Sequence, residues 1–465
     1  MDSRPPPAPP APPTLPQALR FWLWLGCLSF GGPAGQIALM HRELVERRRW
    51  ISEQRFLHAL NYCMLLPGPE AQQLATYIGW LLHRTRGGVA AGALFVLPGL
   101  LVLIALSWAC VRFGQIGWVA GLLDGLKPAV AALVLHALVH MGRRTLGHPR
   151  RNPLLWALAV GSWVALALLD LPFPLLIVLA GLVGVWGARH APLQFAPAPH
   201  ASPGTGHGPA LIDDDTPTPP HARYRPGRLA AVLAVGLLLW LGSMALLLAC
   251  NGGWAEAARE QNTLAQMGWF FTKAALLTFG GAYAVLPYVY QGAVEQFQWL
   301  TGPQMMDGLA LGESTPGPLI MVVAYVGFLG GWARQVLGPD QLFWGGALAA
   351  CVVTWFTFLP SFVFILAGGP LVEASHGLLR YTAPLKAITA AVIGVMCSLA
   401  LFFLMHVLFP GTPLGPEGQL SLARLNGPGL LLTVAAAVAL LRCQIGVLPV
   451  LAACAGAGAL LRLVF

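Results

Sequence analysis

The sequence predicts an all-α polytopic membrane protein. Of its 465 residues, 57% are hydrophobic and only 10% are charged, whereas soluble domains carry roughly 25% charged residues. Five apolar runs each reach the ~20 residues that span the hydrocarbon core of a bilayer. They lie around residues 88–111, 118–141, 228–250, 341–367 and 387–409. These runs indicate one membrane unit, with the lipid bilayer as its main surrounding, rather than a series of soluble domains.

The net charge of +9 does not indicate a nucleic-acid partner. The basic residues gather in short loops beside apolar runs, as in Arg47–Arg49, Arg143 with Arg144, and Arg150 with Arg151. Lys and Arg collect in this way in the cytoplasmic loops of membrane proteins. Because no basic soluble domain is present, we expect no nucleic-acid binding.

Motifs for metals, cofactors and catalysis are absent from the sequence. The eight cysteines are scattered through apolar segments without a C-x-x-C pair, so they resemble buried hydrophobic residues rather than metal ligands. No P-loop, H-E-x-x-H or C-x-x-C-H motif occurs. We therefore expect no metal, no cofactor and no ATP-driven pump within this chain. A membrane-embedded enzyme is the alternative from another functional class, and it lacks a catalytic motif.

Composition divides the chain into five segments. Residues 1–16 are rich in Pro and Ala and are expected to form a disordered tail, and residues 191–227 form a linker rich in Pro, Gly and His. Arginines on both sides of the linker place it in the cytoplasm. The expected units are the tail at 1–16, a first membrane repeat at 17–190, the linker at 191–227, an extra transmembrane helix at 228–249 and a second repeat at 250–465.

The two sides of the linker repeat each other at a constant offset of 249 residues. Phe30-Gly31-Gly32 recurs as Phe279-Gly280-Gly281, Trp50 recurs as Trp299, and Pro67-Gly68-Pro69 recurs as Pro316-Gly317-Pro318. A fixed offset of this kind indicates a duplicated unit.

Loop charges indicate that the two halves have opposite orientations. Residues 41–55 contain five arginines, whereas the equivalent stretch, residues 291–304, contains neither Lys nor Arg. Since basic loops face the cytoplasm, the halves are expected to be inverted, and the extra helix at 228–249 supplies the crossing that turns the second half over. Inverted-topology repeats are common in transporters.

Each half begins with two apolar segments that Gly and Pro interrupt at the centre. Proline removes a helical N–H, and glycine permits conformations that other residues avoid. Each segment is thus either a re-entrant hairpin or one discontinuous spanning helix. The first reading gives nine crossings plus four re-entrant hairpins, and the alternative gives 13 transmembrane helices. The arginines at 41–55 favour the hairpins.

The four breaks predict an anion site at the middle of the membrane. Irregular backbone at that depth is tolerated only when it is buried or lines a cavity, and the N-terminal ends of the half-helices bind anions without a buried cation. Breaks that serve only as kinks for tight packing are the alternative. The candidate substrate-binding residues are Ser29, Gly31, Gly32, Gln36, Pro67, Gly68, Pro69, Gln72, Gln73, Tyr77, Thr278, Gly280, Gly281, Pro316, Gly317 and Pro318.

Within this set, the hydroxyls and amides have two interpretations. Ser29 and Thr278 occupy equivalent positions and carry hydroxyls that can donate to an oxyanion, although Ser and Thr also bend or cap membrane helices. The neutral donors of Gln36 and Tyr77, and of the pair Gln72 and Gln73, serve ordinary interhelical hydrogen bonds equally well.

Glu70 is the candidate proton-coupling residue. It begins a half-helix directly after Pro-Gly-Pro inside an apolar segment, and acidic residues inside membranes are costly and usually functional. Its alternative role is to stabilise the helix dipole.

His41, Arg42, Arg48 and Arg49 form a basic stretch that predicts either a cytoplasmic vestibule for anions or an anchor to lipid headgroups. Because the acid and most polar donors lie in the first half, that half is expected to dominate binding and coupling.

Three segments resemble the chromate transporter (CHR) family in its long, two-domain form. They are Phe30-Gly31-Gly32-Pro33-Ala34-Gly35-Gln36, Arg48-Arg49-Trp50-Ile51-Ser52 and Pro67-Gly68-Pro69-Glu70-Ala71-Gln72-Gln73. The second half departs from this pattern, with Ala282 at the position of Pro33 and Leu319 at that of Glu70. The resemblance covers both halves.

The resemblance implies chromate efflux across the bacterial inner membrane, driven by the proton-motive force and conferring chromate resistance. It also implies sulfate as a structural analogue of the substrate. Transport of sulfate or another tetrahedral oxyanion is the alternative, because the residues do not separate two dianions of similar size. Assembly into a homo-oligomer stays open at this point.

Overall fold

The computed structural model of the chain is predominantly helical in its described part. It describes residues 10–30, 32–169, 171–191, 194, 209–213, 216–217, 219–250, 262–279, 281–374, 382–410 and 425–464. Two of the candidate site residues, Gly31 and Gly280, lie outside these ranges. Among the described residues the only β-type pairing is an isolated bridge between Ile51 and Ile212, so the predicted all-α class is confirmed.

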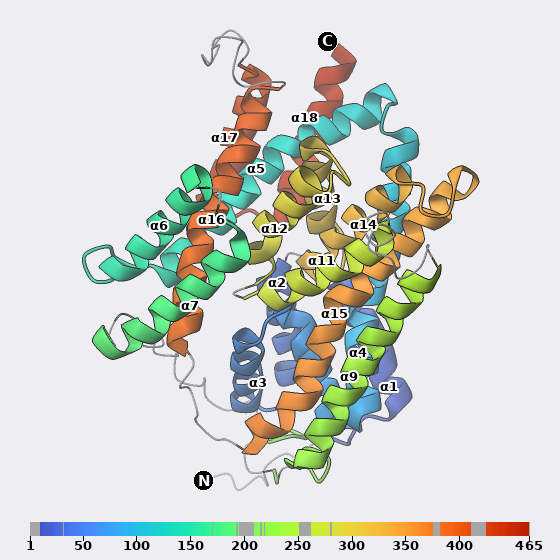
Figure 1. The fold of residues 1–465 in the computed structure, drawn as a ribbon, viewed down its shortest axis with the longest axis vertical. Helices are drawn as coiled ribbons and strands as arrows, with labels where there is room; N and C mark the ends of the chain where they lie inside the picture. Colours follow the sequence, from blue (N-terminus) through green and yellow to red (C-terminus); the bar gives the residue numbers. More distant parts are fainter. Residues whose placement is uncertain are drawn as a thin grey trace, which may run out of the picture.

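Among the described residues, the first half contains seven α-helices and a short π-helical turn (Figure 1). They are α1 (Leu15–Leu28), α2 (Gly32–His41), η1 (Arg42–Arg47), α3 (Glu53–Leu65), α4 (Glu70–Phe113), α5 (Gly117–Thr145), α6 (Pro153–Leu169) and α7 (Phe173–His190). After the linker, α9 (Pro226–Cys250) runs along α15 at the side of the molecule.

The second half has the same order of elements. They are α11 (Thr263–Leu277), α12 (Ala282–Tyr290), η2 (Gln291–Gln296), α13 (Gly302–Ser314), η3 (Leu319–Met321), α14 (Val322–Ala333), η4 (Pro339–Gln341), α15 (Leu342–Ala374), α16 (Thr382–Leu408), α17 (Gly427–Leu441) and α18 (Val447–Val464). The two π-helical turns begin 249 residues apart, which is the offset of the sequence repeat.

The long helix α4 consists of two limbs that reverse direction at His83 and Arg84. Arg84 has φ 56°, a left-handed conformation that an α-helix does not contain. The limbs then pack side by side, since a Cβ added to Gly79 would stand 2.5 Å from Ala91 Cβ. In the second half, two separate helices, α14 and α15, correspond to the two limbs of α4, and they also pack together.

Each broken segment at the start of a half folds back on itself. In the first half, the ring of Phe21 near the start of α1 lies 4.9 Å from that of Trp50, which follows η1. In the second half, the rings of Phe270 and Trp299 are 5.6 Å apart. The outer ends of the two limbs therefore meet at the same end of the hairpin, and the Gly-containing break forms its tip.

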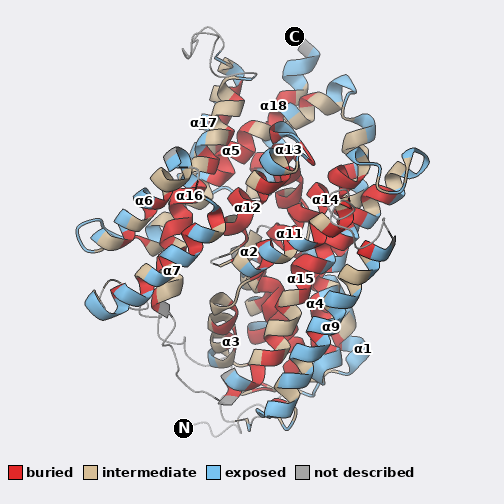
Figure 2. Ribbon diagram, viewed as in Figure 1, coloured by how far each residue is buried: buried red, intermediate tan, exposed pale blue. Residues whose placement is uncertain are grey.

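Six described helices are long and apolar enough to cross a membrane, and α6, α14, α17 and α18 are shorter apolar helices. Large apolar side chains lie exposed on their outer faces (Figure 2), among them Leu238 of α9 at 68% exposure and Leu431 of α17 at 72%. Apolar surface of this extent needs lipid as its solvent. The chain is a multi-pass membrane protein.

The two halves are intertwined. Helix α5 packs against α17 and α18, and α16 packs against α6 and α7. Small residues allow these close approaches: a Cβ on Gly125 would stand 2.1 Å from the Cys454 carbonyl oxygen, and one on Gly394 would stand 1.9 Å from that of Ala159. Packing through small residues is how membrane helices associate without a hydrophobic driving force.

Candidate functional site

The breaks of the two halves meet and exchange main-chain hydrogen bonds. The N–H of Gly68 donates to the Thr278 carbonyl at 2.8 Å, and the N–H of Gly317 donates to the Ser29 carbonyl at 3.0 Å. Gly68 and Gly317 are equivalent in the repeat, as are Ser29 and Thr278. Each Pro-Gly-Pro loop is therefore held by the hairpin tip of the other half.

Glycine is required in both Pro-Gly-Pro loops for its conformation and, at Gly68, also for space. Gly68 has φ 127°, and a Cβ there would stand 2.3 Å from Ser361 Oγ of α15. Gly317 has φ 103°, and the neighbouring Pro316 carbonyl lies so close to Gly99 of α4 that a Cβ on Gly99 would stand 2.5 Å from it. Such φ values are open to glycine but strained for other residues. Each Pro-Gly-Pro loop thus packs closely against a long helix of the opposite half: Pro67–Pro69 against α15 and Pro316–Pro318 against α4.

The two predicted hydroxyl donors are buried but already engaged. Ser29 Oγ donates to the Leu25 carbonyl and Thr278 Oγ1 to the Ala274 carbonyl, both at 2.7 Å. This is the back-bonding to the preceding helical turn that Ser and Thr adopt in membrane helices. In this conformation their carbonyls, rather than their hydroxyls, join the halves.

Three buried glutamines surround the breaks. Gln36 Nε2 donates to the Gly317 carbonyl and to the Ser29 carbonyl, while Gln72 Nε2 donates to Thr76 Oγ1 at 3.0 Å and Gln73 Nε2 to the Pro67 carbonyl at 2.8 Å. The side-chain Oε1 of each glutamine has no hydrogen-bond partner among the described residues.

Each of these neutral amides can present either its acceptor oxygen or its N–H donors to the breaks. Oε1 accepts hydrogen bonds, and a half-turn of the amide puts the two N–H donors in its place. An oxyanion needs donors, so rotation of the glutamine amides would convert the present arrangement into a receptive one.

Glu70 lines an open cavity of about 710 Å³. The cavity is lined by Gly35, Ile37, Ala38, Leu39, His41, Arg42, Glu46, Phe56, Leu57, Leu60, Met64, Glu70 and Arg144. Its carboxylate also borders the second half, because a Cβ on Gly281 would stand 4.0 Å from Glu70 Oε1. Glu70 thus connects an open cavity of the first half to a break of the second.

Four of the residues that line this cavity are Arg or Glu, and Glu70 is one of them. Arg42 and Arg144 supply two cations, whereas Glu46 and Glu70 supply two carboxyl groups. Protonating Glu70 leaves the lining with a positive balance, which attracts an anion. The net charge of the cavity lining therefore depends on the protonation state of Glu70.

The four predicted vestibule residues separate into two groups. His41 and Arg42 line the cavity, and the His41 ring contacts Glu46 at 3.2 Å and Glu53 at 2.5 Å. Arg48 instead stacks on the Phe21 ring at 4.5 Å. The main chain of Arg49 accepts a hydrogen bond from Leu211 of the linker.

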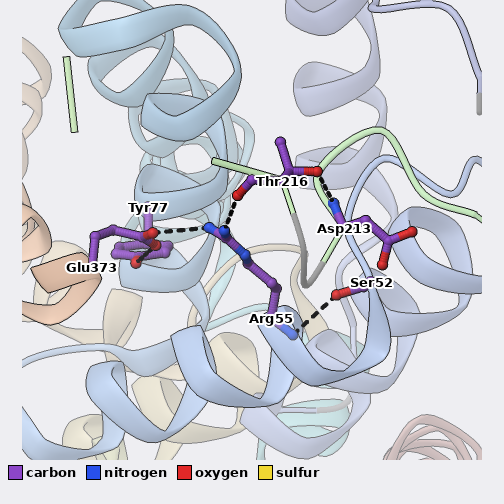
Figure 3. Close-up of polar contacts among 6 residues, drawn as sticks. All are labelled: Ser52, Arg55, Tyr77, Asp213, Thr216 and Glu373. Atoms are coloured by element: carbon purple, nitrogen blue, oxygen red, sulfur yellow. Dashed lines mark hydrogen bonds and ion pairs between the residues drawn. The ribbon is translucent and has the colours of Figure 1, made fainter. Parts of the chain in front are cut away.

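Tyr77 lies away from the breaks, in a buried cluster that joins the two halves to the linker (Figure 3). Its hydroxyl donates to Glu373 Oε1 of α15 at 2.5 Å, and Glu373 Oε2 accepts from Arg55 Nη1 at 2.8 Å. Arg55 Nη2 also donates to the Thr216 carbonyl of the linker at 2.7 Å. This cluster therefore links α3 and α4 of the first half to α15 of the second half and to the linker.

The match to known proteins follows the two halves. The family model for chromate transporters matches residues 16–185 and 265–459. The chain belongs to the chromate transporter family. The family match leaves out residues 186–264, which contain the linker and α9, so the shared part consists of the two repeats.

Relatives with chromate in their names resemble most of the chain. A chromate transport protein of Cupriavidus metallidurans is 30% identical over 82% of this chain and 81% of its own length. One of Pseudomonas aeruginosa is 32% identical over 84% of this chain and 80% of its own length. An uncharacterised transporter of Bacillus subtilis is 31% identical over 26% of this chain and 61% of its own length. These relatives are named as transport proteins, not as enzymes. No solved structure matches the chain.

Sequence reasoning missed several polar residues of this region. Ser361 of α15 lies against Gly68 and Gln73, and Arg144 lines the cavity beside Glu70. Glu313 is buried on α13, three residues before the second Pro-Gly-Pro loop. An acidic residue beside a break in an apolar segment was the signal that would have identified Glu313.

Proposed function

We propose that this member of the chromate transporter family exports chromate from the cytoplasm across the bacterial inner membrane. The observation that carries the proposal is the reciprocal contact between the breaks, at Gly68 with Thr278 and Gly317 with Ser29. It supports an anion site formed jointly by both halves. The names of the relatives support chromate as the anion.

The charge of chromate makes export favourable. A negative-inside membrane potential contributes ~2.3 kcal/mol per charge per 100 mV. Expulsion of a dianion therefore gains about 4.6 kcal/mol at 100 mV, which corresponds to a gradient of roughly 10³-fold. The membrane potential, which is the electrical part of the proton-motive force, supports this efflux, and chromate resistance is its proposed result. Each proton exported together with chromate would reduce the gain by about 2.3 kcal/mol at 100 mV.

The proposed architecture consists of two inverted repeats, at residues 17–190 and 250–465, with α9 as the additional crossing. The second limb of α4 and the helices α5, α6, α7, α9, α15, α16, α17 and α18 make nine crossings. The folding back of the segments at Phe21 with Trp50 and at Phe270 with Trp299 supports re-entrant hairpins over spanning helices. The basic residues on both sides of the linker support a cytoplasmic position for it.

Glu70 is the proposed proton-coupling residue. It faces the cavity of the first half and borders the break at Gly281. An ionised Glu70 repels chromate, whereas a protonated Glu70 leaves Arg42 and Arg144 in excess around the entering dianion. Proton binding and anion binding are therefore coupled through this side chain.

Everted inner-membrane vesicles containing the protein test the proposal directly. On energisation they should accumulate labelled chromate, because export from the cell becomes uptake into an everted vesicle. Vesicles without the protein are the control, and excess sulfate measures selectivity. Accumulation no greater than in the control vesicles would rule out chromate export. Stronger accumulation of sulfate than of chromate would make sulfate the substrate.

A further inference from the structure

The second half contains a buried carboxyl group beside its breaks. Glu313 is only 5% exposed and lies three residues before Pro316. Its Oε1 accepts a hydrogen bond from the Tyr283 hydroxyl. Its Oε2 has no hydrogen-bond partner among the described residues. One oxygen of the carboxyl group is thus held in place, while the other remains unpaired in the protein interior.

Tyr283 places Glu313 at the same break that Glu70 approaches from the first half. Tyr283 is the second residue of α12, two positions after Gly281. Gly281 in turn borders Glu70 Oε1. One carboxyl group, that of Glu70, therefore borders the tip at Gly281 and lines the open cavity. The other, that of Glu313, is buried and hydrogen-bonded to the side chain of Tyr283, two residues after Gly281.

No described cation neutralises Glu313. No Lys, Arg or His nitrogen among the described residues forms an ion pair with it, although Arg55 and Glu373 show that this protein does pair buried charges. Four titratable groups on the helices that pack around α13 interact instead with Asp307, six residues earlier on the same helix. They are Asp124 and Lys127 of α5, Tyr325 of α14 and Cys110 of α4.

Chemistry then favours the acid form of Glu313. An unpaired carboxylate in a membrane interior is costly, and a single phenol hydrogen bond offsets only part of that cost. With a proton on Oε2, the group becomes a hydrogen-bond donor, as a protonated carboxyl group is in other anion-stabilising sites. A neutral donor suits an oxyanion, whereas a carboxylate repels it.

We propose that Glu313 is a second proton-binding group of the anion site, protonated on Oε2 while an oxyanion is bound and positioned by Tyr283. The proton comes from solvent, forms the O–H bond on binding and returns to solvent on release, so no other reactant is needed. This inference rests on the proposed function, since the anion is chromate.

The first half has no equivalent of this pair. Residues 249 positions before Glu313 and Tyr283 are Met64 and Ala34, neither of which binds protons. Met64 lines the cavity that contains Glu70. Contrary to the expectation that the first half dominates coupling, each half would contribute one carboxyl group, from non-equivalent positions.

Chromate binding to the purified protein, measured across mildly alkaline pH where chromate is the dianion, tests the inference. Each proton taken up with the anion makes the Kd rise about tenfold per pH unit. Wild type should lose affinity with rising pH, and Glu313→Gln should bind chromate with a pH slope smaller by up to that tenfold factor. Asp307→Asn, which removes a buried carboxyl group from the same helix, is the matched control and should keep the wild-type slope.

The outcomes separate the two proposals. An unchanged slope in Glu313→Gln, with chromate still bound, overturns the role of Glu313 and leaves chromate transport intact. Absence of chromate binding by wild type at every pH overturns both proposals. If Glu313→Gln does not fold, Tyr283→Phe decides. This variant removes the hydroxyl that donates to the Glu313 carboxylate, so the pH at which chromate affinity is half lost should rise. An unchanged midpoint contradicts the inference.

Discussion

Replacing Arg55 by Ala is expected to destabilise the protein by about 3 kcal/mol. Its side chain is 13% exposed and that of Glu373 is 5% exposed, with Nη1 and Oε2 2.8 Å apart. Removing one partner of a buried ion pair costs roughly 3–5 kcal/mol, because the other charge stays buried. Glu373 keeps its hydrogen bond from Tyr77, and this remaining donor places the cost at the lower end of the range.

This loss of stability can be measured by unfolding the protein in mixed micelles of a mild detergent and SDS. The fluorescence of the 16 tryptophans follows the unfolding. The matched variant is Glu373→Gln, which removes the buried anion. The double variant should be no less stable than Arg55→Ala alone, because it contains no uncompensated carboxylate. A loss below about 1 kcal/mol for Arg55→Ala, or simple addition of the two single losses in the double variant, would refute the reasoning.

Three further predictions concern the breaks, the coupling residue and the linker. Gly68→Ala should stop transport and unfold more easily than Gly32→Ala, because a Cβ at Gly68 meets Ser361 at 2.3 Å whereas one at Gly32, with φ 69°, meets nothing within 4 Å. Gly32→Ala should cost only the roughly 1–2 kcal/mol of a left-handed conformation, and equal effects on transport and thermal unfolding would contradict this account. Glu70→Gln should change the rate and flatten the pH profile of chromate transport in vesicles, and an unchanged rate and profile would exclude Glu70 from coupling. Burial, helped by nearby guanidinium groups, lowers the pKa of His221, whose Nε2 donates to the main chain of α4. The linker contact is therefore stable above the ordinary histidine pKa of about 6.5 and weakens as pH falls, so acid should speed proteolysis of the linker in wild type but not in His221→Asn.

The sequence predicted the features that depend on local backbone chemistry. Gly68 and Gly317 have positive φ values, and a residue type that tolerates them is visible in a single chain. The constant offset also revealed which positions are equivalent. The place of Glu70 after a proline inside an apolar segment is visible in the sequence, and the structure has this residue lining a cavity.

Features set by tertiary packing were not predictable in the same way. The place of Tyr77 beside Glu373, rather than at the breaks, depends on how α15 crosses the first half. The hydroxyl of Ser29 turns back onto its own helix, although its residue type is equally compatible with anion binding. The partner of Glu313, namely Tyr283, is 30 residues away in the chain, so only the folded hairpins bring the two together.

The position of bound chromate tests the central claim most directly. Crystals of the protein soaked in chromate and measured at the chromium absorption edge would locate the metal by its anomalous signal. The account predicts a single strong peak between the two Pro-Gly-Pro loops, within reach of Gln36 and Glu70. A peak confined to the surface loops, or none at saturating chromate, would contradict an anion site built from the breaks of both halves.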